Sequence, residues 1–286
     1  MRCCLAVLAL SLTACQVPTR TPPPDGAVFR PTTADLKDVA KAAAAAPKPV
    51  LVVLDIDDTL LATVKSGTEH AFYGSDRWYR WQYALPPHDA DKVPCLLPHA
   101  LYWNSQVVPL EAVQSDAPEI VNGLPMDRLI LTSRGSAQRP GTERALIGAR
   151  YALGTPLPGV NATTMPGAHG DMTYEQGILM TGGTPKGVAI TKLLENRSST
   201  HYRSIVMADD DSGNLISVRD ALKQSALLQP VEFIGLRYTR IKDEPLTAPT
   251  EEMKQSAHAA WIVWREWLRK YERGAAEDLE SAECMQ

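Results

Sequence analysis

The sequence predicts an α/β fold: a doubly wound, parallel, Rossmann-like sheet with a small, mainly helical cap inserted after the first strand motif. Two observations lead to this prediction. Short apolar runs rich in Val, Ile and Leu, typical of strands buried on both faces, alternate with stretches of helical pattern. Because parallel strands need long crossover connections, this alternation indicates a sheet covered by helices. In addition, the segment between the first two strands is too long for a simple crossover.

The first 34 residues are expected to lie outside the folded domain. Residues 1–14 combine an early arginine, a short apolar run and small residues, which resembles the signal peptide of a bacterial lipoprotein. Cys15 would then be the lipidated first residue, and Gln16 after it resembles outer-membrane sorting. Residues 15–34 are rich in Pro and Thr and are predicted to be a flexible tether. A plain cleaved signal and a wrongly assigned start codon stay open as alternatives.

The predicted core occupies residues 35–63 and 125–250. An alanine-rich helix ends before Pro47 and leads into the first strand, "VLVVL". Further strands are predicted at "RLILTS", "SIVMADDD" and "VEFIGL", with helices such as "APEIVNGL" and "GNLISVRDALKQSALL" between them. In sheets of this kind, ligands bind beyond the carboxyl ends of the strands.

Two segments complete the predicted domain. Residues 64–124, which include "FYGSDRWYRWQYAL", are interpreted as the cap. Residues 251–286 are predicted to carry a docked C-terminal helix, because apolar residues recur there at helical spacing. Aromatic residues of the cap could form a wall for a nucleobase or an aryl group, but the helical spacing of Trp78 and Trp81 favours a buried face for that pair.

Composition excludes some classes of function. The formal net charge is −4, so the basic surface that binds nucleic acid is not indicated, and no nucleic-acid partner is expected. The only membrane contact expected is through the N-terminal lipid, which would place the protein in the cell envelope, on the periplasmic side. Beyond the N-terminal segment, Cys95 and Cys284 remain; whether they pair is open, and there is no cysteine spacing typical of zinc sites.

Three carboxylates follow the first buried strand directly, in "DIDDT" at residues 55–59. Asp55 and Asp57, separated by one residue, can both reach the loop that follows the strand. A divalent cation there would offset their repulsion, and magnesium favours carboxylates, carbonyls, waters and a substrate phosphate as ligands. The segment is therefore a candidate site for Mg²⁺ and phosphate.

Three further motifs follow along the chain. Thr132 ends the strand of "LILTSRG", where a hydroxyl can hold a phosphoryl oxygen, although such a threonine often caps its own turn. Lys186 begins a predicted helix after "GGTP", although a single lysine is more often a solvated surface charge. The strand "IVMA" ends in three acids from Asp209 onwards, with Asn214 shortly after; adjacent acids are usually a solvated turn.

In this order the four motifs resemble those of the haloacid dehalogenase superfamily in its phosphatase form. The resemblance implies that Asp55 attacks phosphorus to give an aspartyl-phosphate. It implies that Asp57 protonates the leaving alkoxide and then takes a proton from the hydrolytic water. Thr132 and Lys186 would bind the phosphoryl group.

The same resemblance implies Mg²⁺ as the cofactor, with the ligands Asp55, Asp57 (through its backbone carbonyl) and Asp209. Asp210 would be a second ligand or support one, and Asn214 would tie the loop. Asp211 is expected to cap the next helix, and Asp58 is expected to be structural. Arg134, two residues after the threonine of the second motif, is the best candidate for gripping the substrate, ahead of the arginines of the cap, Arg77 and Arg80.

Two closer resemblances bear on function. Segments such as "YGSDRWYRWQ", "YEQGILMTGGTPKG" and "ADDDSGNL" resemble a family of uncharacterised bacterial proteins related to these phosphatases. The lipoprotein signal and the acidic motifs are similar to class C acid phosphatases, although Asp58 stands where that class usually carries Glu. The resulting hypothesis is a lipid-anchored, Mg²⁺-dependent phosphohydrolase acting on a small phosphorylated substrate. The alternatives are a non-catalytic envelope lipoprotein that binds metal or a phosphorylated ligand, and a phosphotransferase.

Overall fold

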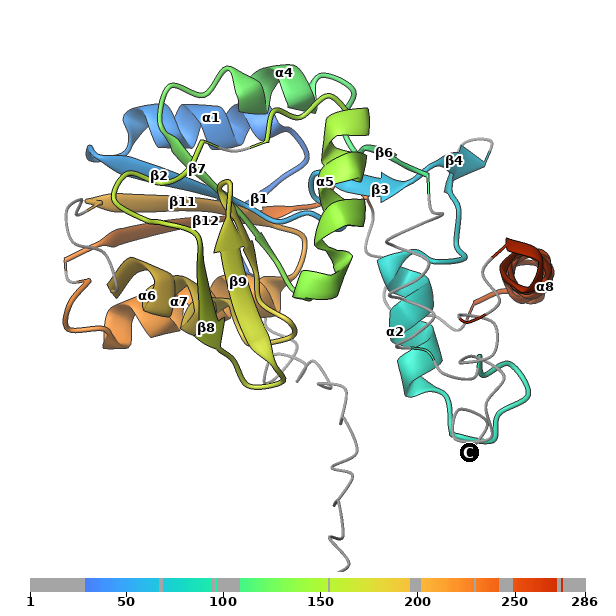
Figure 1. Ribbon diagram of the computed structural model, residues 1–286. Helices are drawn as coiled ribbons and strands as arrows, with labels where there is room; N and C mark the ends of the chain where they lie inside the picture. Colours follow the sequence, from blue (N-terminus) through green and yellow to red (C-terminus); the bar gives the residue numbers. More distant parts are fainter. Residues whose placement is uncertain are drawn as a thin grey trace, which may run out of the picture.

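An eight-stranded sheet flanked by helices forms the centre of the molecule (Figure 1). The computed structural model describes residues 29–66, 69–93, 96, 109–153, 155–195, 202–228, 230–241, 249–271 and 274. The strand order is β1-β12-β11-β2-β7-β10-β9-β8, and each neighbouring pair from β1 to β10 is parallel. These parallel strands are β1 (Thr32–Thr33), β2 (Val50–Leu54), β7 (Asp127–Thr132), β10 (Ile178–Met180), β11 (Ser204–Asp209) and β12 (Glu232–Tyr238). The predicted α/β architecture with a mostly parallel sheet is confirmed.

Helices cover both faces of this sheet because its central strands are apolar on both sides. In β2, Val52 and Leu54 face one hydrophobic core, and Leu51 and Val53 face the other. The first core is covered by α1 (Leu36–Ala45), α4 (Ala117–Asn122) and α5 (Arg139–Gly148), and the second by α6 (Lys186–Glu195) and α7 (Ser212–Gln224). The carboxyl ends of the parallel strands are thereby held in one row.

One edge of the sheet departs from the prediction. Strands β8 (Thr163–Pro166) and β9 (Asp171–Glu175) form a hairpin that is antiparallel to β10, so the sheet is mixed and not wholly parallel. Residues of β8 and β9 alternate between exposed and buried positions, as expected for an edge with one face in solvent. These two strands were not predicted, because they lack the continuous apolar run that marks a strand buried on both faces.

The insertion after β2 contributes short strands and a helix. β3 (Leu61–Thr63) pairs with β6 (Leu110–Ala112), and β4 (Lys65–Ser66) pairs with β5 (Glu69–His70). The helix α2 (Asp76–Ala84) begins at Ser75, whose side chain accepts a hydrogen bond from the backbone N–H of Trp78. In the described part of the insertion, short strands thus accompany the helix α2.

The C-terminal helix α8 (Glu251–Tyr271) packs on this insertion beside α2 (Figure 1). A third apolar core joins the two, and it includes Trp78 from α2 together with Trp261, Trp264 and Leu268 from α8. The predicted apolar face of the helix is confirmed. The cap is therefore built from two segments that are far apart in the sequence.

Two of the predicted domain boundaries need correction. Residues 117–122, assigned to the cap, form α4, which packs against α1 in the first core because Ala117 and Val121 are apolar and buried. Residues 32–33, assigned to the tether, form β1 and pair with the end of β12. The backbone hydrogen bonds of this added strand fix the chain to the sheet edge.

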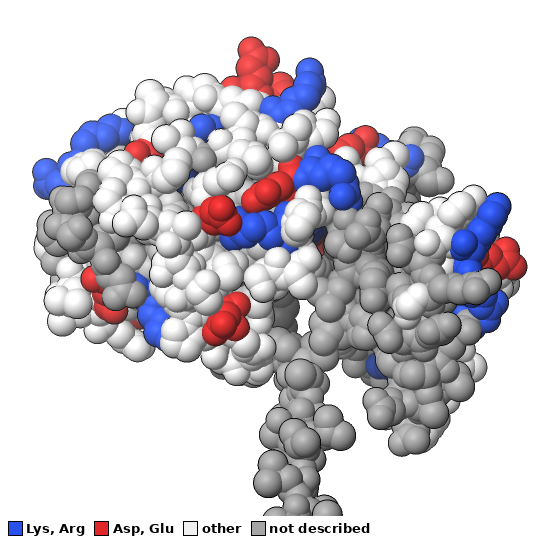
Figure 2. All heavy atoms as spheres, in the orientation of Figure 1, with Lys and Arg blue, Asp and Glu red and all other residues white. Residues whose placement is uncertain are grey.

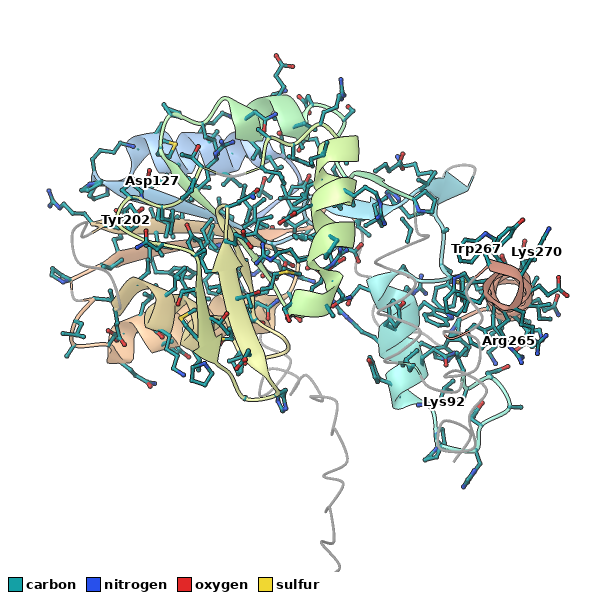
Figure 3. All side chains as sticks on the ribbon, in the orientation of Figure 1. Lys92, Asp127, Tyr202, Arg265, Trp267 and Lys270 are labelled. Carbon is teal, nitrogen blue, oxygen red and sulfur yellow. The ribbon has the colours of Figure 1, made fainter. Side chains whose placement is uncertain are left out.

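The two ends of the sheet differ in what surrounds them. At the amino ends of β7 and β11, Tyr202 donates a hydrogen bond to Asp127 over 2.6 Å, far from the cap (Figure 3). The carboxyl ends face the side on which α2 and α8 lie (Figure 1). On the face shown in Figure 2, acidic and basic side chains are interspersed. None of the helices in the described part of the chain is long and apolar enough to cross a membrane.

Candidate active site

Two buried carboxylates stand side by side at the carboxyl ends of β2 and β11. Because Leu54 is paired with Ala208, the next residues in each strand, Asp55 and Asp209, are neighbours. The Nζ atom of Lys186 lies 2.5 Å from Asp55 Oδ1 and 2.7 Å from Asp209 Oδ2. All three side chains are buried. The structure therefore brings together three of the residues predicted from separate motifs.

Lys186 reaches this position through a glycine turn. Gly182 and Gly183 have φ angles of +55° and +80°, which side chains other than glycine rarely adopt. Their N–H groups donate to the carbonyls of Arg134 and Ser133, so the turn is attached to the loop after β7. Lys186 follows as the first residue of α6. The "GG" of the sequence thus sets the path of the chain that leads to the lysine.

The remaining oxygen of Asp209 is held by the loop that follows it. Asp209 Oδ1 accepts hydrogen bonds from the backbone N–H of Asp211 and from Asn214 Nδ2, both over 2.9 Å. Asp211 accepts a hydrogen bond from Gly213 N and caps α7, as predicted. Asn214 ties the loop to Asp209 through this hydrogen bond, as predicted.

Asp210 extends the group of carboxylates towards the cap. Its backbone N–H donates to Thr59 Oγ1, and carboxylate oxygens of Asp55, Asp209 and Asp210 all lie within 4.8 Å of one another. Asp210 also belongs to a second group, in which carboxylate oxygens of Asp58, Asp76 and Asp210 lie within 4.8 Å of one another. Asp76 was not singled out in the sequence, since an acid in the first turn of a helix is common.

Arg80 of α2 connects the cap to this loop. Its Nη2 lies 2.5 Å from Asp76 Oδ2 and 3.4 Å from Asp210 Oδ2. The sequence makes Arg80 a candidate for gripping a substrate, whereas in the structure it contacts Asp76 and Asp210. Arg77, a candidate of the same kind, lies over the ring of Phe72 at 5.9 Å.

Asp57 contacts Arg134 and belongs to neither of the two carboxylate groups described above. Arg134 Nε lies 3.1 Å from Asp57 Oδ2, and Arg134 Nη2 lies 2.7 Å from Asp57 Oδ1. The turn between them and β3 is tight: Asp58 has a φ of +58°, and its N–H donates to the carbonyl of Leu61. The structure therefore separates Asp55 and Asp57, which face different cations.

Thr132 ends β7 in a fully buried position. Its backbone carbonyl accepts from the N–H of Thr181, and its Oγ1 accepts from the backbone N–H of Arg134 over 3.2 Å. Because β7 is the direct neighbour of β2, Thr132 and Asp55 both lie at the carboxyl ends of adjacent parallel strands. The hydroxyl also caps its own turn, so the two interpretations of this residue are compatible.

Crowding of carboxylates in a buried place changes their acidity. Burial raises the pKa of Asp55 to about 7, the nearby Asp209 adds to this, and Lys186 opposes it. Burial and neighbouring carboxylates also hold the pKa of Asp58 and of Asp210 well above the usual range. For Lys186, burial lowers the pKa, but the contacts with Asp209 and Asp55 outweigh this and raise it. The site has more negative charge than its own cations offset.

This donor set fits a hard divalent cation. Asp55, Asp209 and Asp210 offer carboxylate oxygens within reach of one position, and oxygen ligands of this type suit Mg²⁺. Both carboxylate oxygens of Asp57 lie on Arg134, so only the backbone carbonyl predicted as its ligand atom is left for the metal. The structure groups the carboxylates of Asp55 and Asp209 with that of Asp210, which was expected to be a second ligand or to support one.

The aromatic residues of the cap divide into two kinds. Trp78 is buried in the third core, as the helical spacing predicted, and its ring packs edge-on against Tyr73 and Tyr79. Burial raises the pKa of Tyr79, and Asp57 adds to this while Arg134 opposes it, so Tyr79 lies within electrostatic reach of both.

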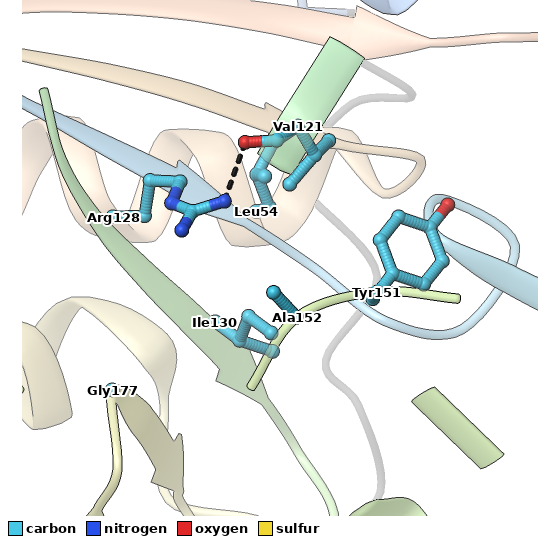
Figure 4. A pocket seen from close by; sticks show the side chains of 7 residues that line it. All are labelled: Leu54, Val121, Arg128, Ile130, Tyr151, Ala152 and Gly177. Carbon is cyan, nitrogen blue, oxygen red and sulfur yellow. Dashed lines mark hydrogen bonds between the residues drawn. The ribbon is translucent and has the colours of Figure 1, made fainter. Parts of the chain in front are cut away.

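A small cavity lies behind the strand ends (Figure 4). Its volume is about 10 Å³, and it is lined by residues that include Leu54, Ile130, Tyr151 and Arg128, whose guanidinium donates to the carbonyl of Val121. A space of this size holds about one water molecule. It is too small for a substrate and contains none of the candidate site residues.

Cys15, Cys95 and Cys284, on which the predictions of lipidation and of a disulfide depend, lie outside the described residues.

Comparison with known proteins gives one match. No curated protein and no solved structure matches the chain. A family described as "Protein of unknown function (DUF2608)" matches residues 32–273, a range that contains every site residue described above. The match covers most of the chain, and the protein therefore belongs to this family.

Proposed function

We propose that this protein is a Mg²⁺-dependent phosphomonoester hydrolase of the haloacid dehalogenase type, acting through an aspartyl-phosphate. The observation that carries the proposal is the contact of Lys186 with both Asp55 and Asp209 at adjacent strand ends. A lysine buried between two carboxylates balances a nucleophile and a metal ligand in one place. Residues from three of the four motifs meet there, and Thr132 of the remaining motif ends the neighbouring strand β7. Along the chain, the four motifs follow the order that the superfamily resemblance requires.

The chain's own residues would divide the chemistry between them. An oxygen of Asp55 forms a bond to phosphorus while the bond from phosphorus to the leaving oxygen breaks, and Asp57 gives that oxygen a proton. In the second step water attacks phosphorus, Asp57 takes a proton from the water, and Asp55 leaves as a free carboxylate. Thr132 and Lys186 hold the phosphoryl oxygens during both steps.

Asp55, Asp209 and Asp210 would hold the metal ion. When bound, Mg²⁺ supplies positive charge that neutralises the phosphoryl oxygens and the crowded carboxylates. The grouping of its carboxylate with those of Asp55 and Asp209 supports Asp210 as a ligand. Asp57 would contribute its backbone carbonyl, as the resemblance implies. The ionised form of Asp55, which the reaction needs, is favoured when a cation offsets the raised pKa.

The proposal includes a location. A lipid on Cys15 would attach the domain to the outer membrane on the periplasmic side, where small phosphorylated molecules are the substrates. The support is the sequence pattern of residues 1–15.

The test is hydrolysis of p-nitrophenyl phosphate by the full chain with Mg²⁺ and with EDTA, beside the variant Asp55→Asn. We expect turnover that requires Mg²⁺ and falls by about 10³-fold or more in the variant, because the nucleophile is missing. Thermal unfolding of both proteins checks that the variant is folded.

Other outcomes select among the alternatives. A folded protein that binds Mg²⁺ but hydrolyses no member of a diverse phosphate panel would replace the enzyme by a binding protein. Transfer of the phosphoryl group to an added alcohol in preference to water would indicate a phosphotransferase.

A further inference from the structure

We propose that Arg134 is a positioning residue that holds Asp57, the proposed proton donor and acceptor, and does not grip the substrate phosphate. This inference rests on the proposed phosphatase function. It is carried by the geometry of the Arg134 side chain, which comes from the loop after β7 and meets Asp57 in the loop after β2.

The contact has the form of a fork. Nε and Nη2 of Arg134 donate to different oxygens of Asp57, over 3.1 and 2.7 Å. Two parallel hydrogen bonds fix the plane of a carboxylate, whereas a single bond leaves it free to rotate. The fork therefore determines the direction in which Asp57 presents its oxygens.

Arg134 is itself braced from behind. Its Nη1 donates to Thr142 Oγ1 over 3.0 Å, and the Thr142 hydroxyl donates to the carbonyl of Gln138 over 2.8 Å. The Gln138 side chain in turn accepts from the backbone N–H of Gly135 over 2.9 Å. These bonds attach the guanidinium to the short helix η3 (Ser136–Gln138) and to α5. The arginine is held in place before any substrate arrives.

The exposure of the two partners assigns their roles. The side chain of Arg134 is only 5% exposed, whereas that of Asp57 is 41% exposed. A substrate can thus reach the carboxylate, while the guanidinium lies behind it. Three of the five N–H groups of Arg134 already serve Asp57 and Thr142, and turning the buried guanidinium towards a phosphate would break these bonds. Proton transfer needs a carboxylate within hydrogen-bonding reach and in a defined orientation, which this arrangement provides.

The two roles predict different kinetics. Loss of a positioning residue lowers kcat, leaves KM and the inhibition constant of inorganic phosphate nearly unchanged, and affects most the substrates whose leaving group needs a proton. Loss of a residue that grips phosphate raises KM and the inhibition constant for every substrate alike.

The experiment compares Arg134→Gln, Asp57→Asn and the double variant in the full chain with Mg²⁺, using p-nitrophenyl phosphate and an alkyl phosphate. We expect Asp57→Asn to lower kcat for the alkyl ester by about 10²–10⁴-fold. Arg134→Gln should lower it by about 10²-fold, with a smaller loss for the aryl ester, whose leaving group needs no proton. The double variant should be no worse than Asp57→Asn alone, since both changes remove one function.

A matched control is Arg80→Gln, which removes another arginine paired with an acid of the site, Asp210. Its effect should add to that of Asp57→Asn. Arg134→Lys retains the charge without the fork and should recover only part of the lost kcat, which separates orientation from charge and serves if the glutamine variant is unstable.

Three results would overturn the inference. Equal losses on both esters together with a weakened inhibition by inorganic phosphate would assign Arg134 to phosphate binding. A further loss of activity when Arg134→Gln is added to Asp57→Asn would assign it a general structural role. Full activity of Asp57→Asn would show that Asp57 transfers no proton in the reaction, so Arg134 would have no proton donor to position. The phosphatase activity itself would still stand. If the wild-type protein hydrolyses no phosphomonoester, the proposed function fails, and the inference that depends on it fails too.

Discussion

Lys186 is the residue that makes the buried part of the site possible. A single ammonium group contacts two carboxylates that would otherwise repel each other in an environment of low dielectric constant. The compensation is incomplete, because Asp210 belongs to the same group and Asp55 keeps a raised pKa. The folded protein therefore carries an electrostatic cost at neutral pH that a bound cation would relieve.

This cost predicts how stability depends on pH. The pKa of Asp55 rises from 3.8 to about 7 on folding, so the folded state binds its proton more tightly than the unfolded state does. Stability contributed by the protonated form is present near pH 4 and is lost as the pH rises towards 7. In EDTA, we expect the Tm of Asp55→Asn minus the Tm of the wild type to increase as the pH rises from 4 to 7, because only the wild type loses this stability.

Thermal unfolding at several pH values measures this difference. Addition of Mg²⁺ should raise the wild-type Tm at pH 7 more than that of the variant, because the ion binds the ionised carboxylates of the folded state. A difference in Tm that stays constant from pH 4 to 7 would show that folding does not raise the pKa of Asp55.

At the scale of single elements, the start of α6 determines where Lys186 lies. Gly187, the next residue, packs against α7 so closely that an added Cβ would lie 2.2 Å from the Ser217 carbonyl oxygen. Its N–H also donates to Ser217 Oγ over 3.2 Å. The contact between two helices thus fixes the lysine one residue away.

Gly187→Ala should therefore destabilise the protein and displace Lys186. The backbone of α7 cannot move aside as a flexible side chain would, and overpacking of this kind costs about 1–3 kcal/mol. Gly148→Ala at the end of α5 is the matched control, because an added Cβ there meets nothing within 4 Å. Denaturant unfolding of both variants measures the difference; a Gly187→Ala protein as stable as the control would contradict the close contact.

At the scale of the whole molecule, the cap depends on the C-terminus. Trp264 of α8 is 3% exposed in the third core, whereas Trp267 on the same helix is 37% exposed. Trp264→Ala should cost about 3–5 kcal/mol of packing, because a buried indole leaves a cavity. Trp267→Ala, the control, should cost much less.

Thermal unfolding and limited proteolysis test this pair. In the Trp264→Ala protein, cleavage should become faster within the insertion and stay slow in the sheet, since the two have separate cores. Equal protease resistance of the two tryptophan variants would show that α8 does not support the insertion.

The sequence predicted those parts of the molecule that leave a strong local signal. It placed the four central strands, together with Asp55, Asp209 and Lys186. Apolar runs there end abruptly in polar residues, which marks the carboxyl ends of parallel strands. The contacts of Arg134 with Asp57, and of Arg80 with Asp210, could not be placed, because they join side chains from loops and helices whose relative position depends on tertiary packing. The partner of α8 was missed for the same reason: an amphipathic pattern predicts a buried face but does not identify what covers it.

The division of the cap between two distant segments has a consequence for the order in which the protein assembles. The strands of the sheet all precede α8, the helix that shares the third core with α2. Contacts between segments so far apart form late, because a long loop must close before they contribute. During folding, the strand ends are therefore in place before the cap is finished.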